Sequence, residues 1–193
     1  MLGETNKAYG GIMSELFART LAKFSAPAIC GIKSSNLLSI SKEEFVDLKN
    51  DIEEINNLEN HKIRIFILKE TTDRMLILVF QPFILESYIN ERNNKSFLIN
   101  IGYSNLYNLG STLNHLKLRI NNSSSFPHEI GIFLGYDICD VKAFIEHKTC
   151  LYQGPWKIYS NVEEKKKIFA QYEECTNKML DELANGHSLY KYL

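Results

Sequence analysis

The run Arg74 to Gln81, RMLILVFQ, constrains the fold of this chain more than any other stretch. It is apolar at nearly every position, which is typical of a strand that is covered on both faces of a sheet. The run before it, Lys62 to Glu70 (KIRIFILKE), is also rich in strand-forming residues, and a polar turn joins the two. The sequence therefore predicts an antiparallel hairpin over residues 62–81, with its second strand in the centre of a sheet.

Helix signals mark most of the remaining chain. An amphipathic stripe begins at Met13, a capping box occupies Ser41–Glu44, and Pro82 suits the first turn of a helix. With further signals downstream, helices are predicted over about 13–26, 45–58, 82–92, 106–120 and 162–183. Because proline breaks a helix interior, Pro27 is expected to end the first of these helices.

The fold class that these elements predict is α+β, a small, mainly antiparallel sheet packed by about six helices. The sheet is expected to consist of the hairpin 62–81 and short strands near 28–33 and 155–160. A chain of 193 residues suits one domain. Residues 1–12 are polar and contain glycine, so we expect a flexible extension there and a single α+β domain over 13–193.

Charge and cysteine content set limits on function. The formal net charge is −1, whereas proteins that bind nucleic acids usually have a basic excess or a basic face. The apolar runs are much shorter than the ~20 residues of a membrane helix, and the N-terminus lacks the apolar region of a signal peptide. The four cysteines are widely spaced, without a CxxC pair. We expect a cytoplasmic protein with reduced thiols, no metal site, no membrane segment and no nucleic-acid partner.

The stretch FPHEIGIFLGYDICDV, residues 126–141, predicts two short helices around a tight turn. Pro127 favours a helix start, Gly135 favours its end, and Asp137 or Asp140 caps a second helix. The result is a corner like a helix-turn-helix over 127–147, in which Gly131 lets the helices cross closely. The second helix is too acidic to contact phosphates, which argues against DNA reading and for a structural corner.

His128 and Glu129 fall in the first turn of the predicted 127–135 helix. The helix dipole there stabilises a carboxylate and favours neutral imidazole, which acts as a base, donor or ligand. The pair is therefore a candidate catalytic site, with His128 as acid/base and Glu129 as its partner. The alternative is that Glu129 only stabilises the helix start and His128 only packs.

The same stretch resembles the signature of an uncharacterised family from anaerobic bacteria, a domain of unknown function. That family has Phe-Pro-His-Glu-Ile-Gly, then Phe-Leu-Gly-Tyr and Asp-Val, and later Cys, Gly-Tyr-Trp-Lys-Val-Tyr and a closing helix with Phe, Tyr and Cys. The chain matches at 126–131, 133–136, 140–141, Cys150, Gly154, Trp156, Lys157, Tyr159, Phe169, Tyr172 and Cys175. Where the family often has His-Cys before Ala-Pro, this chain has Phe24-Ser25. The resemblance implies a family and no activity.

Further candidates lie in the segments that resemble the family. Tyr136, Trp156 and Tyr159 are predicted to line a pocket for a planar ligand, or else to belong to the core. Lys33 and Lys157 are candidates to contact an anionic ligand, to pair with Glu129, or to remain on the surface.

Two cysteines and one run of charged residues are the remaining candidates for functional groups. Cys150 and Cys175 flank the Trp156 segment. They either form a redox pair or a metal site, or serve as small buried residues, which is the favoured alternative. The run Glu163–Lys167 (EEKKK) is predicted to be a solvated helix face.

Two hypotheses of different class follow. In the first, the chain is a small ligand-binding protein or enzyme, with its site at the start of the 127–135 helix and with no cofactor specified. In the second, it is a non-catalytic interaction or regulatory module with a protein partner, and the corner is purely structural.

Overall fold

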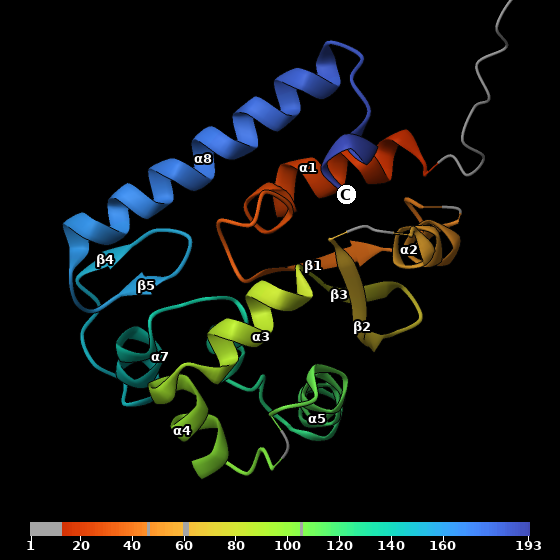
Figure 1. The fold of residues 1–193 in the computed structure, drawn as a ribbon. Helices are drawn as coiled ribbons and strands as arrows, with labels where there is room; N and C mark the ends of the chain where they lie inside the picture. Colours follow the sequence, from red (N-terminus) through yellow and green to blue (C-terminus); the bar gives the residue numbers. More distant parts are fainter. Residues whose placement is uncertain (1–12, 46, 60–61, 105) are drawn as a thin grey trace, which may run out of the picture.

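A computed structural model describes residues 13–45, 47–59, 62–104 and 106–193 (Figure 1). The predicted extension 1–12 lies outside these residues. The first half of the chain gives α1 (Glu15–Ile29), β1 (Ser35–Ser41), α2 (Leu48–Asn57), β2 (Arg64–Glu70), β3 (Arg74–Phe80), α3 (Pro82–Asn90) and α4 (Arg92–Asn100). The second half gives α5 (Leu109–Asn122), α6 (Ile130–Phe133), α7 (Ile138–Ile145), β4 (Tyr152–Gln153), β5 (Lys157–Ile158), α8 (Val162–Ala184) and the 3-10 helix η1 (Leu189–Tyr192). The predicted α+β class is confirmed.

The main sheet has three antiparallel strands in the order β1-β3-β2. The β2–β3 hairpin and the central position of its second strand are therefore confirmed. Side chains of β3 alternate between two cores, with Ile77 in one and Leu78 in the other, and neither is exposed. The first core contains α1, α2 and η1, and the second contains α3, α5 and α6. An apolar run without alternation is what burial on both faces requires.

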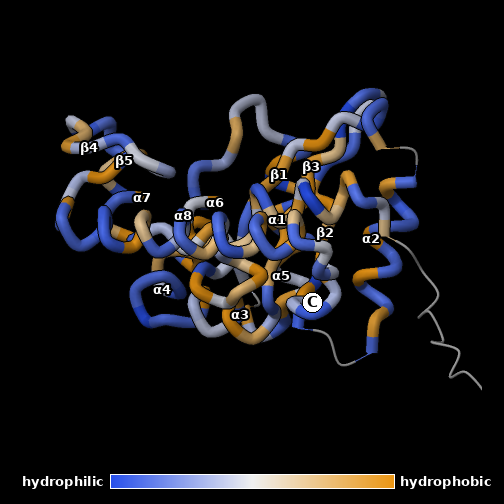
Figure 2. The backbone as a smooth tube through the Cα atoms, turned by 90° about the horizontal axis from the view of Figure 1, so that it is seen from above, coloured by the Kyte–Doolittle hydropathy of each residue, from blue (hydrophilic) through white to orange (hydrophobic). Residues whose placement is uncertain are grey.

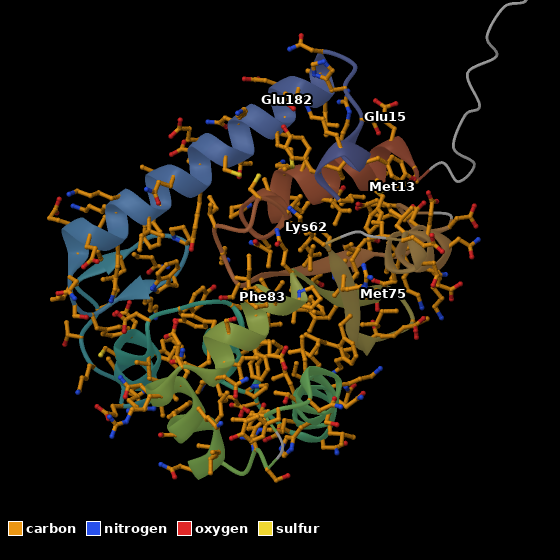
Figure 3. All side chains as sticks on the ribbon, in the orientation of Figure 1. Met13, Glu15, Lys62, Met75, Phe83 and Glu182 are labelled. Carbon is orange, nitrogen blue, oxygen red and sulfur yellow. The ribbon has the colours of Figure 1, made fainter. Side chains whose placement is uncertain are left out.

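The side chains in Figure 3 fill the space between α1 and the sheet, where Met13 and Met75 belong to the first core. Along the sheet, Ile77 faces Leu38 of β1 and Ile67 of β2. Residues of α8 and η1 complete this core. The two ends of the described chain therefore pack on the same face of the sheet.

The strand predicted near 28–33 is wrong, because α1 continues through Pro27 to Ile29. Proline removes only one backbone donor, and here it lies in the last turn, so the helix loses little. Gly31, with φ +76°, then ends the helix. Its N–H donates to the Ala28 carbonyl (3.1 Å) and the Ile32 N–H donates to the Pro27 carbonyl (3.0 Å). This Schellman turn carries the chain to β1, which begins at Ser35.

The capping box predicted at Ser41–Glu44 is also wrong. Ser41 is the last residue of β1, opposite Arg74 of β3. The helix that follows begins at Leu48, with Asp47 as its N-cap residue. The pairing of Ser41 with a distant strand therefore determines the local structure, and the capping pattern does not. The predicted 82–92 helix ends at Asn90, and the separate helix α4 was not predicted.

The predicted corner is confirmed as α6 and α7, although its first helix spans only four residues. The segment predicted as a strand over 155–160 does not join the main sheet. It contributes β5, which pairs with β4 in a separate two-stranded hairpin. Figures 1 and 2 show β4, β5 and α7 together at one end of the molecule and α2 at the other. No helix in the described part of the chain is both long and apolar enough to cross a membrane.

Candidate functional site

A cavity of about 320 Å³ lies between the α6–α7 corner and the β4–β5 hairpin. Its lining is mainly apolar and includes four aromatic rings, Phe126, Tyr136, Phe144 and Trp156. The polar side chains in the lining are His128, Asp140 and Lys157. Four of the predicted site residues, His128, Tyr136, Trp156 and Lys157, therefore meet at one cavity.

Glycines shape the corner that forms one wall. A Cβ atom on Gly131 would lie 2.7 Å from Cγ2 of Val141, so only glycine lets α6 and α7 pack this closely. Gly135 turns the chain with φ +73°. The carboxylate of Asp137 then caps α7 by accepting from the Cys139 N–H (2.7 Å). The corner therefore has three predicted features: a close helix crossing at Gly131, a turn at Gly135 and a helix cap at Asp137.

Trp156 forms the opposite wall and is held on several sides. Its ring stacks on Tyr136 at a centroid distance of 4.7 Å and meets the Phe169 ring edge-to-face at 4.5 Å. Its indole N–H donates to Asp140 Oδ2 (3.0 Å). A Cβ atom on Gly154 would clash with Phe169, so glycine is needed where the hairpin meets α8. The cavity wall is therefore built by residues from three elements before any ligand is present.

A buried ion pair supports this wall, and the sequence analysis did not identify it. Asp140 and Lys165 are 2% and 4% exposed, and Lys165 Nζ lies 2.6 Å from Asp140 Oδ2. The other oxygen, Oδ1, accepts the backbone N–H of Tyr159 (2.9 Å). Lys165 also lies 3.2 Å from Asp137. The prediction that Glu163–Lys167 is a solvated face is therefore wrong for Lys165, because the partner that draws it inward lies 25 positions earlier in the sequence.

The mouth of the cavity carries the two basic side chains. His128 and Lys157 are both exposed. The His128 ring meets Phe144 edge-to-face at 5.0 Å, and Lys157 Nζ lies 5.4 Å from the centre of the same ring. Phe144 thus holds both groups at the rim, where they can contact a ligand and still reach solvent.

Glu129 does not lie with His128 in the lining. It is only 4% exposed, and its carboxylate is bound by Arg119 of α5 and by the hydroxyl of Tyr103 (3.3 Å). Arg119 also donates to the Ile101 carbonyl (3.3 Å). Burial raises the pKa of Tyr103, which stays a neutral donor to the carboxylate. The structure therefore assigns Glu129 to a buried ion pair that ties the corner to α5.

Lys33 and Tyr159 lie near the cavity without lining it. The Tyr159 backbone N–H supports Asp140, as described above. Lys33 is 9% exposed, and its Nζ lies 5.6 Å and 5.8 Å from the ring centres of Tyr136 and Tyr172. Burial lowers the pKa of Lys33 to about 8.

The structure does not support a pair between Cys150 and Cys175. The Cys150 thiol donates to the Tyr152 carbonyl (3.0 Å). Burial raises the pKa of Cys175 to about 12, with a further contribution from the neighbouring Cys30 at the end of α1. Within the described ranges, no three His, Cys, Asp or Glu side chains come together as metal ligands.

Comparison with known proteins identifies a family. No curated protein and no solved structure matches this chain. Residues 21–193 match DUF3793, a family described as proteins of unknown function. The match extends over the corner, the β4–β5 hairpin, α8 and every residue of the cavity lining. The chain therefore belongs to the DUF3793 family, as its resemblance to a domain of unknown function predicted.

Proposed function

We propose that this protein binds a small organic ligand with a planar, apolar body and an anionic group. The observation that carries the proposal is the convergence of His128, Tyr136, Trp156 and Lys157 on one cavity of about 320 Å³. Apolar walls with a few convergent polar groups are typical of small-molecule sites, and the volume suits a one- or two-ring compound. The planar part of the ligand would lie against Trp156, and its anionic group would face the mouth of the cavity.

The basic rim supports the anionic part of the proposal. A lysine ammonium and an imidazole N–H both donate to carboxylate, sulfonate or phosphate oxygens. Asp140 is the only acidic side chain among the lining residues described, and its two oxygens are already bound by Lys165, Trp156 and Tyr159. The ligand's anion would therefore meet positive charge without facing a free carboxylate.

Two other hollows fit a ligand less well. A cavity of about 530 Å³ beside the start of α8 includes Asp137 and Lys165, which already pair with each other. Another, of about 570 Å³, is formed by residues of α8 alone and is mostly acidic. The first of these also contains Trp156 and the exposed Arg92, but three carboxylates, Glu91, Asp137 and Glu164, line it and would repel an anionic ligand. The second has no aromatic side chain.

A second candidate function is a protein-interaction module that uses the same mouth. Phe126 and Phe144 line the cavity and are 45% and 37% exposed. An apolar side chain of a partner protein would enter between these two rings, and acidic residues next to it in the partner would face Lys157. Binding of a free small anion separates the two functions.

The test is a calorimetric titration with naphthalene-1-sulfonate, a planar two-ring anion. We expect one site per chain. Lys157→Met should weaken binding about fivefold, the effect of losing one exposed charged contact. Lys148→Met, at an exposed lysine that pairs with Glu146, is the matched control and should bind as the wild type does.

Equal affinity of the two variants would contradict the anionic contact. Absence of binding to the sulfonate and to its uncharged parent compound would contradict small-ligand binding. In that case the interaction module would become the better proposal.

A further inference from the structure

Two lysines in the described part of the chain, Lys33 and Lys165, are buried, and their surroundings differ. Lys165 is paired with Asp140 and Asp137 and also donates to Ser160 (3.3 Å). Lys33 has no carboxylate and no hydrogen-bond acceptor at its amine among the described residues. A lysine is rarely buried without a partner, because removing the charge from water is costly. The burial of Lys33 therefore needs an explanation other than structural pairing.

The position of Lys33 is fixed by its backbone. Its N–H donates to the Pro27 carbonyl (3.1 Å) in the Schellman turn after α1. The neighbouring Ser34 packs against Gly135, where an added Cβ would lie 2.9 Å from the serine hydroxyl. The amine is thus held near two rings, Tyr136 of the corner and Tyr172 of α8.

These surroundings change the chemistry of the amine. The two tyrosine faces attract a cation, but burial without a counter-charge disfavours the ammonium more strongly. Near physiological pH the neutral amine is therefore far more populated than in an exposed lysine. The lowering of its pKa to about 8 by burial agrees with this geometry. The titratable groups that face Lys33 are Tyr136 and Tyr172, whose own pKa values are raised by burial, so both remain neutral through this range. A neutral amine with a free lone pair is a nucleophile.

We propose that Lys33 is a reactive amine that binds a small aldehyde or ketone covalently as an imine. The Nζ lone pair adds to the carbonyl carbon and gives a carbinolamine, with the amine proton transferred to the carbonyl oxygen. Loss of this hydroxyl as water then forms the C=N bond, so the step needs no oxidant or reductant. This inference does not depend on the ligand cavity, because Lys33 does not line it.

The test is reductive alkylation with acetaldehyde and sodium cyanoborohydride at pH 7.5, followed by mass spectrometry of peptides. Hydride addition to the imine leaves an ethyl group on each lysine that reacted. Lys33 should be labelled about tenfold faster than the exposed Lys157, since its larger neutral fraction outweighs its lower basicity. Lys165, which is also buried but paired, is the control and should react slowest.

Labelling of Lys33 no faster than Lys157 overturns the proposal. Labelling of Lys165 at the rate of Lys33 also overturns it, because local opening would then explain both. Lys33→Arg keeps the charge but should lose the fast site. Lys157→Met, which should weaken ligand binding, should leave the labelling of Lys33 unchanged, so this inference and the proposed function can fail separately.

Discussion

At the scale of single residues, the buried charges of this protein divide into paired and unpaired groups. Asp140 and Glu129 each have a basic partner, and that partner explains why they can be buried. Asp51 is buried as well but accepts from the Ser14 N–H and hydroxyl, so Lys33 is the buried ionisable group described here that has neither a counter-charge nor a hydrogen-bond partner. Natural proteins keep such a destabilising group where function needs it, so its removal should have a measurable effect on stability.

Lys33→Met should make the protein more stable at neutral pH. The folded protein binds the Lys33 proton with a pKa of about 8, whereas the unfolded chain keeps it to about 10.5. Between these values the unfolded state binds more protons, so the stability of the wild type rises with pH. The advantage of the variant should be at most about 3 kcal/mol below pH 8 and should shrink as the pH rises.

Urea unfolding of both proteins at pH 7, 8.5 and 9.5 measures this difference. Tyrosine ionisation affects both proteins alike and cancels in the comparison. A difference that stays constant across the three pH values would show that Lys33 does not titrate in this range in the folded state. Lys165→Met should instead lower stability, because it leaves Asp140 without its partner.

At the scale of elements, the site depends on two contacts between short segments. In the α6–α7 corner, the missing side chain of Gly131 leaves room for Val141 to pack closely. The β4–β5 hairpin is fixed because Asp140 of α7 accepts hydrogen bonds from the Trp156 indole and the Tyr159 backbone. Both contacts join elements that are too short to be stable alone. Each should therefore be sensitive to a single substitution.

Gly131→Ala should destabilise the protein by about 1–3 kcal/mol, the usual cost of overpacking. The added methyl group would meet Val141 Cγ2 at 2.7 Å. Val141→Ala removes that atom, so the double variant should recover part of the loss. Thermal unfolding of the three variants measures the coupling, and purely additive effects would show that the two residues are not in contact.

Asp140→Asn should cost about 3 kcal/mol or more, because it leaves the Lys165 ammonium buried without a counter-charge. The further change Lys165→Met should restore part of this loss. Chemical unfolding of the single and double variants completes the cycle. If the double variant recovers none of the lost free energy of unfolding, Asp140 acts only through Trp156 and Tyr159.

At the scale of the whole molecule, α8 connects the candidate site to the main core. Its first half carries Lys165, Phe169 and Tyr172, which support Trp156 and Lys33. Its second half lies along α1, as Figure 1 shows, and contributes Met179 to the first core. The cavity is therefore formed by segments far apart in the sequence.

The sequence predicted those parts of the fold that depend on local pattern. The hairpin 62–81 and the corner were predicted because apolar runs and turn residues determine them directly. The end of α1 was not, because Pro27 lies in the last turn, where proline costs a helix little. The start of α2 was not, because β1 includes Ser41 of the expected capping box. The same limit applies to the site. His128, Tyr136, Trp156 and Lys157 were predicted, but the long-range partners of Glu129 and Lys165 have no local signal.

The central claim is that the ligand lies against Trp156. Trp156 is the single tryptophan of the chain and lines both this cavity and the one beside the start of α8. Lys157 lines only the first of these two, so a weaker emission change in Lys157→Met assigns the ligand to it. Titration with naphthalene-1-sulfonate should change the emission of Trp156 and saturate at one ligand per chain. Binding of the sulfonate with no change in the emission of Trp156 would place the ligand elsewhere and contradict the account.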